Sequence, residues 1–147
     1  SAHGVLAGYR PEDSPIFDLL IIERSGAAQL TVVAGAGMWA APAWSPWFHR
    51  EDGRRESHIA YGVARLPRDS GNSRYDLFVM DEDGSNRRRI FPPVGGEGLV
   101  APNLAWSPAG RQLVVVYEGN LYLLDVISGE TSQLTSDGHS VQPRWAD

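Results

Sequence analysis

The stretch DEDGSN (residues 81–86) places acidic side chains at the alternating spacing with which a calcium-binding loop begins. A complete loop of the EF-hand type needs a further ligand and a glutamate downstream, but the basic run RRRI follows instead. A turn between two strands, with Gly84 at positive φ, explains the same residues. We therefore expect a hairpin and neither a metal nor a cofactor, and we keep a metal between Asp81 and Asp83 as the alternative.

Nucleophilic catalysis requires a serine or threonine beside a histidine and an acid. The sequence has four histidines, His3, His49, His58 and His139. Neither a G-x-S-x-G elbow nor an H-E-x-x-H motif accompanies them. Ser45 and Ser107 each follow a tryptophan in a turn, where a hydroxyl satisfies backbone amides. We expect a protein that is not an enzyme.

Three consecutive arginines, Arg87, Arg88 and Arg89, form a basic run that could bind phosphate or nucleic acid. On a strand, however, alternate side chains point to opposite faces, so the run does not make one continuous patch. The net charge of −5 also argues against a nucleic-acid partner. We expect a solvated outer strand with acidic partners and no nucleic-acid binding.

Trp39 and the pair Trp47–Phe48 are large apolar residues in turn-rich surroundings. One interpretation is packing against neighbouring loops. The other is a partner-binding surface, because exposed aromatic side chains anchor protein interfaces. Trp39 and Trp47 could instead stack on sugar rings.

The composition predicts one folded domain built from short elements. Of the 147 residues, 42% are hydrophobic and 21% are charged, and 16 glycines and 10 prolines supply turn positions. The absence of cysteine excludes disulfides and thiolate metal sites. The longest apolar run, FDLLII, is strand-sized, so we expect no membrane insertion. The chain begins at Ser1 rather than methionine, and we expect a cut or engineered N-terminus.

Residues 104–135 read as an antiparallel meander. The short apolar segment LAW is followed by the turn SPAG and by the β-branched run QLVVVY. After the turn at GN comes LYLLDV, and SG reverses the chain once more. Four short strands without a helix are predicted.

This series of elements repeats along the chain. The segment APAWSP (residues 41–46) matches NLAWSP (residues 103–108), and QPRWAD (residues 142–147) is a shorter third copy. With the tryptophan strand called A, the chain reads B-C-D, A-B-C-D, A-B-C-D, A. The repeated turn residues are Trp44, Ser45, Pro46, Trp106, Ser107, Pro108 and Trp145.

The spacing of the tryptophans supports this register. Trp106 and Trp145 are 39 residues apart, close to the roughly 40–45 residues of a four-stranded propeller blade. The interval from Trp44 to Trp106 is longer because it holds two polar insertions, residues 47–57 and 66–74, which we expect to be exposed. The three repeat tryptophans are expected to be core residues between blades.

The motifs WSPAG (residues 106–110), WSPWF (residues 44–48) and MDEDGSNRRRI (residues 80–90) resemble the TolB-type β-propeller repeat. Its blade carries a Trp-Ser-Pro-Asp-Gly turn and a D-x-D-G hairpin; here Ala109 replaces the aspartate, and WSPWF lacks both the aspartate and the glycine. The resemblance covers essentially the whole chain. It implies an all-β propeller of four-stranded antiparallel blades that serves as a non-enzymatic scaffold for protein–protein interaction, TolB-like, in an extracytoplasmic or periplasmic location. A propeller of this kind also caps the prolyl oligopeptidase family.

We expect a single domain over residues 1–147 with three blades. Blade 1 consists of strands in about residues 3–35 together with a strand at 141–147, so it is split between the termini. Blade 2 covers about residues 39–93 and blade 3 about residues 100–136.

Three blades are fewer than the usual four to eight of a closed ring. TolB-type propellers have six, by family resemblance, and two copies of this chain would supply six. We therefore expect a homodimer in which Gln142–Asp147 of each chain pairs as a strand with His3–Arg10 of the other.

The loops from strand D to strand A are expected to line the mouth of the ring, and they nominate Trp39, Glu97 and His139 as partner-binding residues beside Trp47 and Phe48. The alternatives are a carbohydrate-binding or enzyme-accessory propeller, or an excised or engineered fragment without a function of its own.

Overall fold

The structure is a computed structural model that describes residues 15–22, 25–26 and 29–146. Within these residues the protein is all-β and its sheets are antiparallel, as predicted. The described part contains no α-helix, only the 3₁₀ turn η2 (Pro67–Asp69). No helix in the described part is long and apolar enough to cross a membrane.

Two four-stranded sheets follow the predicted A-B-C-D order. The second sheet has the order β3-β6-β7-β8 and consists of β3 (Ala43–Trp44), β6 (His58–Ala64), β7 (Tyr75–Asp81) and β8 (Arg88–Phe91). The third sheet has the order β9-β10-β11-β12 and consists of β9 (Leu104–Trp106), β10 (Gln112–Tyr117), β11 (Asn120–Asp125) and β12 (Thr131–Gln133). Both are meanders in which each strand pairs with its neighbour in sequence or, for β3, with the next repeat strand.

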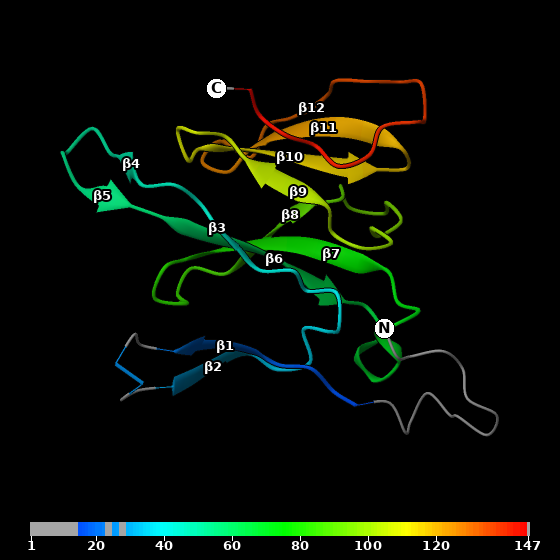
Figure 1. Cartoon of the computed structure of the whole chain (residues 1–147), viewed down its shortest axis with the longest axis horizontal. Coiled ribbons are helices and arrows are strands. Elements are labelled where there is room, and N and C mark those ends of the chain that lie inside the picture. The colour runs from blue at the N-terminus through cyan, green and yellow to red at the C-terminus, as the bar shows by residue number, and fades with distance from the viewer. Residues whose placement is uncertain (1–14, 23–24, 27–28, 147) are drawn as a thin grey trace.

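Two smaller hairpins accompany these sheets. β1 (Leu19–Ile22) and β2 (Gln29–Val33) form the first sheet, and β4 (Phe48–His49) and β5 (Arg55–Glu56) form a hairpin inside the first polar insertion. Figure 1 shows the first, second and third sheets as successive layers, with the β4–β5 hairpin projecting at one end. The predicted strand at His3–Arg10 lies outside the described residues.

The turn serines close the hairpins between strands A and B, as predicted. The backbone N–H of His58 donates to Ser45 Oγ at 2.8 Å, and the N–H of Gln112 donates to Ser107 Oγ at 3.1 Å. Both serines are buried. A buried hydroxyl that satisfies a strand amide explains why the repeat carries serine directly after tryptophan.

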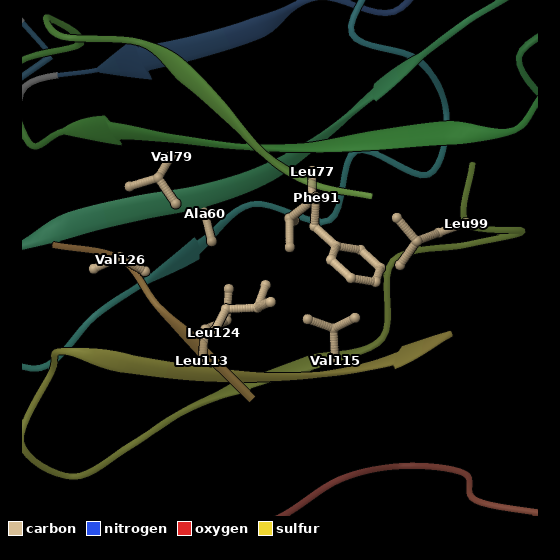
Figure 2. Packing of buried hydrophobic residues seen from close by; sticks show 9 residues of the cluster. All are labelled: Ala60, Leu77, Val79, Phe91, Leu99, Leu113, Val115, Leu124 and Val126. Carbon is tan, nitrogen blue, oxygen red and sulfur yellow. The ribbon is translucent and has the colours of Figure 1, made fainter. Parts of the chain in front are cut away.

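The main core lies between the second and third sheets. Figure 2 shows Leu77, Val79 and Phe91 meeting Leu113 and Leu124 across the interface, with the Phe91 ring between the layers. The register places Val79 opposite Ala60 and Leu113 opposite Leu124, so one face of each sheet supplies the contact.

The second sheet is buried on both faces. Its other set of alternating residues, including Ile59, Tyr61 and Met80, packs with Leu19 of β1. Two-sided burial explains why β6 and β7 are nearly continuous apolar runs rather than alternating ones.

The repeat tryptophans do not share one environment. Trp106 packs against the main core, and its indole N–H donates to the carbonyl of Ala43 at 3.0 Å. Trp145 is half-buried and donates in the same way to Ala105 at 3.1 Å. The prediction of a core position is wrong for Trp44, which is 55% exposed because the two-stranded first sheet packs on β6 and β7 and, in the described part of the chain, does not cover Trp44 on β3. Residues 141–146 belong to no strand in this structure.

The arginine run lies on and beside the outer strand β8, with its side chains divided between the faces. Arg88 is half-buried and donates to the carbonyl of Val126, whereas the exposed Arg89 lies 3.7 Å from Asp76. The predicted acidic partner is therefore present for Arg89. The second polar insertion is less exposed than predicted, because Ser70 and Ser73 are buried and bond to backbone groups of residues 38 and 66.

Candidate functional site

A cleft of about 970 Å³ lies between the β4–β5 hairpin and the turns of the second and third sheets. The hairpin forms one wall, and the start of β6 and the end of β7 contribute side chains at the base. The turns of the third sheet contribute Ala109, Arg111 and Ile127. The lining residues are Trp47, Phe48, His49, Arg50, Glu51, Asp52, Glu56, His58, Asp81, Asn86, Arg88, Ala109, Arg111 and Ile127.

The β4–β5 hairpin carries the aromatic side chains of the cleft. Trp47 is 52% exposed, and the guanidinium of Arg55 lies 4.7 Å from the centroid of its ring. Arg50 and Glu56 form a 2.6 Å ion pair that links the two strands. The arginine contact and the ion pair give a short, polar hairpin the support to present Trp47 toward the cleft.

Phe48 and His58 stack at the inner wall. Their ring centroids are 5.1 Å apart and the planes differ by 16°. His58 is buried, with Nε2 lying 3.4 Å from Asp81 Oδ1, and its Nδ1 has no hydrogen-bond partner. Burial, and then the nearby positive charge of Arg88, lower the pKa of His58; Asp81 opposes the shift. The ring is therefore held in its neutral form near pH 7.

The base of the cleft has charges of both signs. Arg111 lies 2.9 Å from Asp125 Oδ2. Burial would raise the pKa of Asp125, but hydrogen bonds from the Ser128 N–H, from Arg111 and from the Ile127 N–H outweigh it and lower this pKa. Three arginines and four acidic residues line the cleft, so its surface is mixed rather than of one sign.

Close contact between two repeat turns sets the shape of the cleft. Gly110 has φ +75°, and a Cβ at this position would lie 2.3 Å from the carbonyl oxygen of Pro46. Only glycine lets the turn of the third sheet approach the backbone that leads into β4 this closely.

The five predicted partner-binding residues divide into two groups. The structure brings Trp47 and Phe48 together at the cleft. Trp39, Glu97 and His139 lie in the loops before β3, before β9 and after β12. Because the loop before β3 and the hairpin after β3 leave opposite ends of that strand, Trp39 is separated from the cleft; Figure 1 shows the loops after β8 and β12 on the side away from the hairpin as well.

Trp39 is also fixed by local bonds. Its N–H donates to the hydroxyl of Tyr75 at 3.0 Å, and the Tyr75 hydroxyl donates to the carbonyl of Ser70 at 2.8 Å. The Trp39 indole lies 3.4 Å from the carbonyl of Gly71. These contacts match the interpretation in which Trp39 packs against an inserted loop, although 40% of its side chain is exposed.

The acidic stretch forms the predicted hairpin turn. Asp81 and Ser85 pair through their backbones, Gly84 has φ +85°, and Asp83 accepts hydrogen bonds from the N–H and hydroxyl of Ser85. The hydrogen bonds from Ser85 lower the pKa of Asp83. No group of three or more side chains that could hold a metal occurs in the part of the chain described here.

Ser45, His58 and Asp81 lie close to one another but do not form a catalytic relay. The Ser45 hydroxyl is engaged by the backbone, since it accepts from His58 N–H and donates to the carbonyl of Pro46 at 2.9 Å. His58 Nδ1 has no partner, so no hydrogen bond joins the serine hydroxyl to the ring.

Sequence patterns did not identify the base of the cleft. His58, Asp81, Arg88 and Arg111 come from different strands and turns that meet only in the folded protein. The repeat contains one indication of this site. His58 and Gln112 occupy equivalent positions, since the N–H of each donates to the repeat serine, and a titratable side chain thus stands where the neighbouring repeat has an amide.

Four-stranded antiparallel meanders packed face to face, with repeat turns meeting at a cleft, define a protein built from β-propeller blades. Residues 53–143 match the family described as the dipeptidyl peptidase IV (DPP IV) N-terminal region, which is a family of β-propeller domains. This match covers more than half of the chain, and the chain belongs to that family. No curated protein matches the sequence.

Proposed function

We propose that this protein is a non-enzymatic β-propeller scaffold that binds an extended segment of a partner protein in the cleft beside the β4–β5 hairpin. The observation that carries the proposal is the placement of Trp47 and Phe48 on a hairpin that borders a cleft of about 970 Å³. Aromatic residues at the edge of a concave surface are the usual anchors of protein interfaces.

The side chains of the cleft favour a peptide over a partner whose charges are all of one sign. Arginine and acidic side chains line the cleft together with the aromatic residues, so a segment with both apolar and charged groups meets complementary partners. Membership of a family whose N-terminal domain is the non-catalytic part of a peptidase supports a binding role. In the TolB-like form of the proposal, the scaffold acts as part of a closed ring of blades.

Binding to a displayed library of random peptides, run in parallel with a glycan array, tests the proposal. We expect the protein to select peptides and Trp47→Ala to weaken their binding by about tenfold or more, because a central aromatic anchor contributes about 2 kcal/mol. Leu66→Ala is the matched control, since Leu66 is also exposed, at 59%, and is not among the residues that line the cleft.

Two outcomes contradict the proposal. Selected peptides that bind the Trp47→Ala variant as well as the unchanged protein would place the binding surface elsewhere. Binding of glycans, lost in Trp47→Ala, with no peptide selected, would identify the carbohydrate-binding alternative.

A further inference from the structure

The same contact joins successive tryptophan-bearing segments twice in this chain. The indole N–H of Trp106 donates to Ala43, and the indole N–H of Trp145 donates to Ala105, at 3.0 and 3.1 Å. Each acceptor is the carbonyl of the residue directly before the tryptophan of the preceding repeat. The contact is therefore a property of the repeat and defines how one tryptophan segment lies on the next.

Trp44 is the first tryptophan in this series, and in the described part of the chain it lacks the contact that the other two make. Its side chain is 55% exposed, and its indole N–H has no acceptor in the described residues. By the rule of the repeat, the missing acceptor is a carbonyl directly before another repeat tryptophan. Arg144, which precedes Trp145, is the residue of this chain that meets the rule and is not already used.

Residues 142–146 also lack a partner, because their backbone is not paired with a strand in the part of the chain that the structure describes. They belong to no strand, and their backbone makes no hydrogen bond to a strand in the described residues. The Trp145 indole and the bond from Ser140 N–H to the carbonyl of Gly119 nevertheless hold the segment against the third sheet. Its backbone is thus positioned and still able to pair.

Trp44 and residues 142–146 of the same chain cannot come into contact. Figure 1 shows the C-terminal segment beyond the third sheet, whereas the first sheet lies on the opposite side of the second. The tryptophans face the preceding layer, as Trp106 does toward Ala43, so Trp44 faces the first sheet and not the segment at 142–146. Intramolecular contact would require the layers of the core to separate.

The two end layers also leave apolar surface uncovered. On β1, Leu20 and Ile22 are 38% and 59% exposed and alternate with Leu19 and Ile21, which pack on the second sheet. On the third sheet, the pair Val116–Leu121 alternates with the residues of the main core, points to the opposite side and is only half-buried. The stack of three sheets therefore has an apolar layer at each end. The first sheet of one copy can cover the third sheet of a second copy.

From these features we infer that Trp44 binds residues 142–146 of a second copy of this chain, with its indole N–H donating to the carbonyl of Arg144 of the partner subunit. Each subunit gives its segment to the other, so the contact closes with twofold symmetry. Six layers then surround one axis at about 60° each, within the range of known propellers. The contact repeats one already made twice within the chain and lies apart from the cleft, so it does not depend on the proposed function.

Sedimentation equilibrium of the 147-residue protein tests the inference. We expect a species of twice 16.1 kDa at micromolar concentration, and we expect Trp44→Ala to weaken dimerisation by at least tenfold because a large anchor is lost from both contacts. Trp44→Phe keeps an aromatic ring and loses the N–H, and we expect a weakening of roughly fivefold for each of the two contacts. Leu66→Ala, which removes a side chain of similar exposure, should leave the equilibrium unchanged.

Mixing two variants distinguishes a direct contact from a loss of folding. Trp44→Ala and Trp145→Ala each damage both contacts of their own homodimer. A mixed dimer places both defects in one contact and leaves the other intact. We therefore expect the mixture to dimerise more tightly than either variant alone, which a merely structural role for either tryptophan would not produce.

Because the chain has no cysteine, a single introduced pair reports the geometry directly. Trp44→Cys and Arg144→Cys proteins, mixed and treated with a short bis-maleimide, should give a covalent dimer, whereas Leu66→Cys with Arg144→Cys should not. A monomeric protein, an unchanged equilibrium in Trp44→Ala, no gain on mixing, or a ladder of open oligomers would each overturn the inference. Failure of these tests with intact peptide binding, or the reverse, separates this inference from the proposed function.

Discussion

At the scale of single residues, His58 combines burial with a proton-binding group that has no partner. Its Nδ1 is unsatisfied and its ring is enclosed by Phe48, while Arg88 and Arg50 oppose a positive charge that Asp81 and Glu56 favour. The unfavourable effects are the larger, so the pKa of His58 falls below its ordinary value of 6.5. The residue is therefore a source of pH-dependent stability.

We expect the protein to lose stability as the pH falls below about 6.5, because the unfolded chain then binds a proton that the folded His58 resists. His58→Gln, which copies the residue at the aligned position Gln112, removes this dependence. Urea denaturation of both proteins between pH 8 and pH 5 measures the effect. Parallel loss of stability in the variant and in the unchanged protein would show that His58 is not responsible.

At the scale of elements, the repeat turns position the cleft, and Gly110 is the residue on which their contact depends. An alanine there has both an unfavourable positive φ and a Cβ within 2.3 Å of the Pro46 carbonyl oxygen, so one turn must move.

We expect Gly110→Ala to lower the free energy of unfolding by about 2 kcal/mol or more. Gly129→Ala is the control, because Gly129 has a similar φ of +77° with no atom near its missing Cβ, and it should cost only about 1 kcal/mol. Chemical denaturation compares the two. Equal losses would mean that backbone strain, and not the contact between turns, explains the effect at Gly110.

Some elements of the fold could be predicted from the sequence and others could not. The two meanders follow from alternating turn residues and β-branched runs, since each strand pairs with its neighbour and needs only local information. The β4–β5 hairpin was missed because its strands have only two residues each, Phe-His and Arg-Glu, which is too short for any apolar alternation to be detected. The cleft was missed because Arg111 and Ile127 reach the hairpin only when two sheets pack.

At the scale of the whole molecule, burial is concentrated in the second sheet. Both of its faces contact another layer, whereas β12 is exposed at all three of its residues. Stability should therefore decrease from the central layer toward the edges.

Amide hydrogen exchange followed by mass spectrometry measures this gradient. We expect the peptides that contain β6 and β7 to exchange slowest and those that contain β12 to exchange fastest. Faster exchange in β6 than in β12 would contradict the assignment of the second sheet as the central layer.

The layered arrangement also determines how the molecule responds to force. The second and third sheets form separate hydrogen-bonded ladders, and side-chain packing with the Trp106 indole bond joins them. Within each meander, tension applied along the chain opens the ladder one bond pair at a time from its outer strand, rather than loading all pairs together. The protein should consequently unfold at low force. Its third sheet would unfold before the second, and extension would proceed in steps.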